Sequence, residues 1–230
     1  MFFWDPTMII LIPAVIISLY AQMKVSSTFH RYSQVPSNRG MTGADVARYI
    51  LNKNGLYDVP IERIGGQLSD HYDPKTRVVR LSADVYGSTS LAALGVAAHE
   101  VGHAVQHDTG YMPLYLRNTI IPVTQIGSYL AIPLFFLGIF MSSPMLVKWG
   151  VLLFGAIVFF QMVTLPVEFN ASSRALRTLG NEGILDASEL KGTSKVLKAA
   201  ALTYVAAALM AVLQLVRLVL ISGILGGRDE

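Results

Sequence analysis

Long runs of apolar residues alternate with polar segments along this chain of 230 residues. Four runs, at about 7–23, 119–141, 146–165 and 199–222, approach the roughly 20 residues that an α-helix needs to cross a bilayer. None of the four carries Asp or Glu in its middle. The pattern therefore predicts four transmembrane helices, the first of them a retained N-terminal anchor.

The polar segments between these runs divide the chain into five parts. We expect an anchor, a water-exposed domain, a transmembrane hairpin, a second polar segment, and a last transmembrane helix with a short tail, at 1–23, 24–118, 119–165, 166–198 and 199–230. Because 53% of the residues are apolar and only 14% are charged, the composition also favours a membrane protein over an ordinary soluble domain.

Within the water-exposed domain, local patterns predict a helix and two strands. In "MTGADVARYILNKNG", Thr42 and Asp45 have the spacing of a capping box and Gly55 marks the end of the helix. The stretches "VPIERI" and "RVVRLS" have the β-branched and apolar content of short strands, and "YDPKT" between them is a turn signal. A small sheet next to the motif described below is expected.

The distribution of Lys and Arg predicts the orientation in the membrane. Fifteen of these residues lie in the two polar segments 24–118 and 166–198, whereas Lys148 and Arg228 flank the spans on the other side. Basic residues concentrate on the cytoplasmic side of membrane spans, so we expect the N-terminus outside and the domain in the cytoplasm. The basic residues are scattered and form no groove-like patch, which argues against nucleic acid as a partner.

The stretch "AAHEVGHAVQH", residues 97–107, carries the candidate chemistry. It belongs to a predicted helix that opens at Ser90 and closes before Gly110. On a helix, His99 and His103 differ by about 6 Å of rise and about 40° of rotation, so both imidazoles can reach one metal ion. Glu100 lies about 100° around the helix, where it can reach a water molecule at the metal without being a ligand. The chain has no cysteine, so a metal must be bound by His, Asp or Glu.

Two residues compete as the third ligand. His107 lies about 12 Å along the helix from His99, which is too far for both to bind one ion, and we interpret it as a polar residue at the helix end. Glu168 follows the third apolar run, on the same predicted side of the membrane as the motif, where Pro166 can start a new helix. Since a carboxylate at the membrane boundary needs a partner, Glu168 is the preferred third ligand.

With "SDHYDP" before the motif and "PVEFNASSRAL" after it, nearly the whole chain resembles the YugP-type bacterial membrane zinc metallopeptidases. More distantly, residues 168–172 are similar to the E-x-x-A-D segment of the HtpX and CaaX-protease group, whose Glu binds zinc. That likeness supports Glu168 as a ligand. It departs at Ser172, where those enzymes have an Asp that orients a zinc-bound His, so either the Ser172 hydroxyl or another acceptor takes that role here.

These observations together predict a mainly α membrane protein of four transmembrane helices with a small α+β, zincin-like cytoplasmic domain. The expected function is a zinc-dependent endopeptidase of the cell membrane, with Zn²⁺ on His99, His103 and Glu168 and with Glu100 as general base. Its expected partners are protein or peptide substrates, membrane-associated ones above all, and the lipid bilayer. The alternatives are a site-2-type intramembrane protease and a metal-binding membrane scaffold without catalysis.

The reaction also needs a donor that stabilises negative charge on the carbonyl oxygen of the substrate. The sequence offers four candidates: His71, Tyr72, Arg174 and Tyr204. His71 and Tyr204 are the first choices among them. The sequence does not indicate the substrate, its cleavage preference or the oligomeric state.

Overall fold

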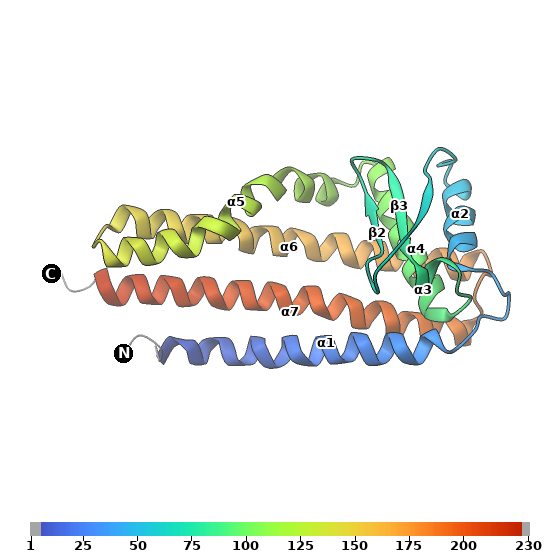
Figure 1. Ribbon diagram of the computed structural model, residues 1–230, viewed down its shortest axis with the longest axis horizontal. Coiled ribbons are helices and arrows are strands. Elements are labelled where there is room, and N and C mark those ends of the chain that lie inside the picture. The colour runs from blue at the N-terminus through green and yellow to red at the C-terminus, as the bar shows by residue number, and fades with distance from the viewer. Residues whose placement is uncertain (1–5, 227–230) are drawn as a thin grey trace. The chain divides into compact units, whose positions relative to one another are not determined.

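Four long helices dominate the computed structural model, which describes residues 6–226 (Figure 1). They are α1 (Ile12–Ser33, preceded by a 3-10 turn at Pro6–Leu11), α5 (Met112–Phe140), α6 (Pro144–Asn181) and α7 (Ala187–Gly226). Each contains a stretch that is long and apolar enough to cross a membrane, and within the described residues no other helix does. The four predicted apolar helices are therefore confirmed as candidate membrane spans, and every one of them continues into the polar parts of the chain.

The chain forms two compact units, and all four long helices contribute to both. The first unit consists of the described residues up to 21, of 115–165, and of those from 203 onward. Its α5–α6 hairpin is closely packed, because a Cβ at Gly150 would lie 2.8 Å from Cα of Phe135. The second unit consists of residues 22–114 and 166–202.

A three-stranded sheet belongs to the second unit. Both predicted strands are confirmed, as β1 (Ile61–Ile64) and β3 (Val78–Ser82), and they pair in parallel. A further strand, β2 (His71–Asp73), pairs antiparallel with β3, so that β3 is central. The Asp-Pro turn therefore connects β2 to β3 and does not join the two predicted strands directly.

The predicted helix ends are also confirmed. The helix α2 (Gly43–Lys53) begins with the capping box of Thr42 and Asp45. The motif helix, α4 (Leu91–Asp108), begins at Ser90, whose side chain accepts a hydrogen bond from Ala93 N–H. A short helix, α3 (Ala83–Tyr86), precedes it.

The helix α4 is the centre of the second unit. It contacts α2, α3, β2 and β3. Its apolar residues, among them Leu94, Ala97 and Val101, are fully buried in one core with residues from α2, α6 and α7. The two imidazoles of the motif are therefore held on a helix that the surrounding elements fix on several sides.

The predicted start of a new helix at Pro166 is wrong. The helix α6 runs unbroken from Pro144 to Asn181, with Pro166 inside it. A proline inside a helix removes one backbone hydrogen bond, and helices that continue from a membrane span tolerate this loss because neighbouring groups satisfy the freed carbonyl. Glu168 thus lies on the same helix as the third apolar run, three residues after the end of that run.

Candidate metal centre

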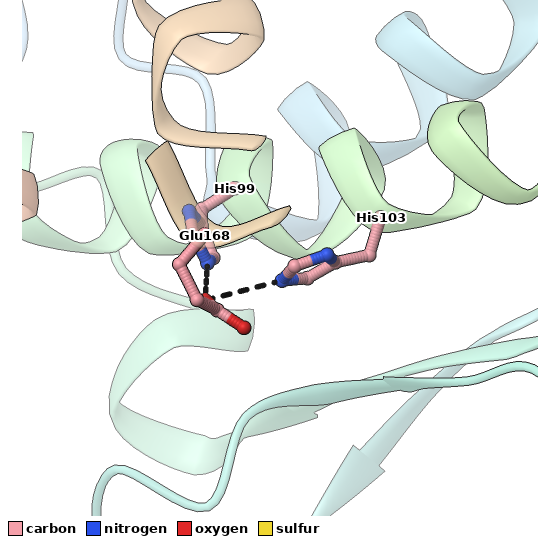
Figure 2. A group of neighbouring side chains, drawn as sticks. All are labelled: His99, His103 and Glu168. Carbon is pink, nitrogen blue, oxygen red and sulfur yellow. Dashed lines mark ion pairs between the residues drawn. The ribbon is translucent and has the colours of Figure 1, made fainter. Parts of the chain in front are cut away.

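Three predicted ligands converge in the second unit. His99 and His103 project from α4, and Glu168 projects toward them from α6 (Figure 2). Oε2 of Glu168 lies 3.3 Å from Nε2 of His99 and 3.5 Å from Nε2 of His103. One donor atom from each residue falls within 4.8 Å of the other two. Two imidazole nitrogens and a carboxylate oxygen around one point form a donor set that suits zinc.

A glycine in the motif permits this convergence. A Cβ at Gly102 would lie 2.9 Å from the carbonyl oxygen of Ala171, closer than side chains approach a backbone. The backbones of α4 and α6 can therefore approach each other at this point, one residue before His103 and three residues after Glu168. Glu168 is buried to 2% exposure and His103 to 9%, so the donor atoms face the protein interior more than solvent.

The nitrogen of His99 that faces away from Glu168 is also engaged. Its Nδ1 lies 3.0 Å from the hydroxyl oxygen of Ser172, one turn after Glu168 on α6. Of the two possibilities left by the sequence, the Ser172 hydroxyl is therefore the group that contacts this imidazole. Such a contact behind a ligating histidine fixes the orientation of the ring.

His103 has a corresponding contact that the sequence did not reveal. Its Nδ1 lies 3.0 Å from Oε1 of Gln106, whose side chain is completely buried. The Gln106 amide donates in turn to the Val167 carbonyl at 2.8 Å and to Oδ1 of Asn170 at 3.0 Å. Oδ1 of Asn170 also accepts from Nε of Arg174 at 2.8 Å. The only signal in the sequence is a glutamine one helical turn after His103, within an otherwise apolar stretch.

Glu100 is positioned by the strand that the sequence missed. Its carboxylate oxygen Oε2 accepts a hydrogen bond of 3.1 Å from the backbone N–H of Tyr72 in β2. Among residues 6–226, Glu100, which is 9% exposed, belongs neither to the group of three donors nor to an ion pair. The arrangement places a buried carboxylate next to the candidate ligand His99 on α4.

Two aspartates flanking Tyr72 fix β2 against β3. Asp70 accepts hydrogen bonds from the backbone N–H of Ser82 at 2.7 Å and from its hydroxyl at 3.0 Å, while burial raises the pKa of the Asp70 carboxyl. Asp73 accepts from the Thr76 hydroxyl and from Arg80, and these bonds, the one from Thr76 first, hold the pKa of its carboxyl well below the usual range. The strand that holds Glu100 is therefore fixed on both sides of Tyr72.

Other residues singled out from the sequence lie elsewhere. His107 is outside the donor group, and its Nδ1 is 2.8 Å from the Tyr72 hydroxyl. The exposed ring of His71, at the start of β2, is hydrogen bonded to the carbonyl of Ser69 at 2.8 Å, two residues earlier in the chain. Tyr204 belongs to the first unit. Among the candidate oxyanion donors, Tyr72 donates its backbone N–H to Glu100, and Arg174 donates Nε to Asn170, a partner of Gln106.

The comparisons with known proteins agree with this chemistry. Residues 7–223 match the family described as "Putative neutral zinc metallopeptidase". The chain is also 53% identical over 219 residues to the "Putative membrane protease YugP" of Bacillus subtilis (strain 168), which covers 95% of this chain and 96% of that protein. No solved structure matches the chain significantly. The resemblance to the YugP-type proteins is thereby confirmed, and the chain belongs to the family described as "Putative neutral zinc metallopeptidase".

Proposed function

We propose that this protein is a membrane-integrated, zinc-dependent endopeptidase with His99, His103 and Glu168 as its metal ligands. The observation that carries the proposal is the convergence of two Nε2 atoms and one carboxylate oxygen within 4.8 Å, with the buried Glu100 next to one of the ligands. A binding protein needs the three ligands, whereas Glu100 is a group that only a hydrolase needs. The family supports zinc as the metal.

Different residues of the site have different roles in peptide hydrolysis. Bound zinc would supply a Lewis acid that lowers the pKa of a water molecule toward neutrality and polarises the peptide carbonyl. Glu100 accepts the proton of the attacking water and later delivers it to the amine that leaves. The Tyr72 N–H holds the carboxylate of Glu100 in position for both transfers. Ser172 and Gln106 hold the two imidazole rings.

The location of the third ligand supports membrane-associated proteins as substrates. Glu168 follows the apolar run of α6 by three residues, so the centre is at the end of a predicted span. The fifteen Lys and Arg on that side of the spans support a cytoplasmic site in the cell membrane, with the small α+β unit as a zincin-like catalytic domain. Substrates would then be membrane proteins, or peptides close to the cytoplasmic face.

The alternative of a site-2-type intramembrane protease fits less well. That reading expects the HExxH motif within a membrane span and an aspartate from a later span as a ligand. Here α4 is not among the four apolar helices, and it is buried against α2 and the sheet. The residue opposite the two histidines is a glutamate beyond the apolar run.

Cleavage by the Glu100→Gln variant tests the proposal against a scaffold without catalysis. The full-length protein in proteoliposomes would be given an unfolded, fluorescently labelled protein, with and without a chelator. Wild type should cleave it in a chelator-sensitive manner, whereas Glu100→Gln should lose activity by about 10²- to 10⁴-fold and keep its zinc. The exposed Glu62→Gln serves as matched control. Near wild-type turnover by Glu100→Gln would exclude Glu100 as the base, and loss of zinc would show that it is a ligand.

A further inference from the structure

The buried amide of Gln106 has three hydrogen-bonding contacts, and their chemistry fixes its orientation. Nε2 of Gln106 faces the carbonyl oxygen of Val167, which can only accept a hydrogen bond. The amide nitrogen must therefore be on that side, where it also reaches Oδ1 of Asn170. The amide oxygen is then necessarily the atom that faces His103, at 3.0 Å from Nδ1.

This orientation determines the protonation of one ring nitrogen. An amide oxygen has no proton to donate, so the hydrogen bond exists only if Nδ1 of His103 carries the proton. In a neutral imidazole the lone pair is then on Nε2, the atom that faces Glu168. His103 thus presents its metal-binding nitrogen toward the other two donors before any ion arrives.

The same side chain connects two of the ligands. Val167 and Asn170 lie on either side of Glu168 in α6, so the amide of Gln106 bridges from one ligand on α4 to the segment that carries another. We infer that Gln106 is a positioning residue of the metal centre: it selects Nε2 of His103 as the ligand atom and holds the Glu168 segment against α4. The inference rests on the proposed zinc site and identifies Gln106 as a residue that raises the affinity of this site for zinc.

Loss of this amide should affect the centre more than the fold. The Val167 carbonyl is part of a continuous helix and has the backbone bond of that helix. Oδ1 of Asn170 retains Nε of Arg174 at 2.8 Å. Only Nδ1 of His103 would lose its hydrogen-bond partner, Oε1 of Gln106. Without this bond neither the orientation of the imidazole ring nor its tautomer would be fixed. Substitution of groups behind a ligating histidine typically lowers metal affinity by about 10- to 100-fold.

Zinc affinity of the Gln106→Met variant tests the inference. Methionine has nearly the same length and volume as glutamine but makes none of the three hydrogen-bonding contacts. The metal-free, full-length protein in detergent would be titrated with zinc in competition with a chromophoric chelator. We expect binding about 10- to 100-fold weaker than in wild type, with an unfolding temperature of the metal-free protein close to the wild-type value.

The chain supplies a matched control. His30, near the end of α1, and Gln34, the residue after α1, form an exposed glutamine–histidine pair, with Nε2 of Gln34 at 3.2 Å from Nε2 of His30. Gln34→Met should therefore leave zinc affinity unchanged. A wild type that binds no zinc would refute the proposed function itself, whereas tight wild-type binding together with unchanged affinity in Gln106→Met would refute only the role of Gln106.

A spectroscopic measurement on the wild type does not depend on the folding of Gln106→Met. In the zinc-loaded wild type with ¹⁵N-labelled histidine, Nδ1 of His103 should be protonated, and its proton should exchange slowly with solvent because Gln106 holds it. Assignment would use His103→Ala, which lacks the signal. A ring that binds metal through Nδ1, or an Nδ1 proton that exchanges as fast as in a free imidazole, would overturn the inference even if Gln106→Met failed to fold.

Discussion

Gly102 of α4 faces the backbone of α6 so closely that a Cβ there would lie 2.9 Å from the carbonyl oxygen of Ala171. The contact is between the helix with the two histidines and the helix with Glu168. The distance between the histidines and Glu168 therefore depends on Gly102, a residue of the motif that is not itself a metal ligand. The close approach of α4 and α6 explains why a glycine occupies this position of the HEVGH sequence.

Replacement of Gly102 by alanine should disturb the centre without removing a ligand. The added methyl group must push α6 away from α4, which by the usual cost of overpacking lowers stability by about 1–3 kcal/mol. Glu168 then moves relative to the histidines, so zinc affinity should also fall. Thermal unfolding and zinc titration would measure the two effects. Gly87→Ala is the control, because a Cβ at Gly87 meets nothing within 4 Å, and equal behaviour of the two variants would contradict the prediction.

Metal analysis should separate the ligands from the third histidine of the motif. Purified His103→Ala and Glu168→Ala each lose one of the three converging donors and should retain little zinc. His107→Ala should keep the wild-type content of one zinc per chain, because His107 contacts Tyr72 and lies outside the donor group. Full occupancy in Glu168→Ala would exclude Glu168 as the third ligand.

Removal of the hydroxyl behind His99 should weaken zinc binding. Ser172→Ala eliminates the contact of 3.0 Å with Nδ1 of His99 and should lower zinc affinity by about tenfold or more. Ser172→Thr keeps a hydroxyl and should bind more tightly than the alanine variant. The adjacent Ser173, exposed on the same helix, provides the control as Ser173→Ala. Unchanged affinity in Ser172→Ala would mean that the hydroxyl does not orient the ring.

Cysteine labelling can decide the orientation in the membrane, since the chain has no cysteine of its own. Met145, between the second and third apolar runs, and Tyr57, in the small unit, are 68% and 73% exposed. In intact cells an impermeant thiol reagent should modify Met145→Cys and should not modify Tyr57→Cys until the membrane is opened. The opposite pattern would place the candidate metal centre outside the cell.

Features with a local cause were predictable from the sequence. The ends of α2 and α4 were predicted because Thr42 and Ser90 bond to backbone groups three residues away. The four apolar helices were predicted because length and composition decide whether a helix can span a bilayer. The convergence of Glu168 with His99 and His103 was predicted from the distribution of Lys and Arg, which places them on one side of the membrane, and from the family resemblance. These two signals were needed because the residues are far apart in the sequence.

Features that depend on distant partners were not predictable. The strand β2 is only three residues long and exists because β3 pairs with it, and because Tyr72 donates to Glu100. Pro166 suggested a helix start by local rules, but α6 continues through it. The role of Gln106 depends on Val167 and Asn170, more than sixty positions later, and no spacing within α4 reveals them.

The groups behind both imidazoles, a hydroxyl and an amide, carry no charge. Among the three ligands only Glu168 is anionic, so the ligand set compensates one of the two charges of a divalent ion. Glu100, when ionised, supplies the second negative charge and makes the centre neutral. When Glu100 takes up the proton of the attacking water, its negative charge would pass to the oxygen that attacks the peptide carbonyl, so the net charge of the centre would stay at zero. Because the hydroxyl and the amide are uncharged, the negative charge that develops on the substrate oxygen would replace that of Glu100, and the centre would hold it without a change in net charge.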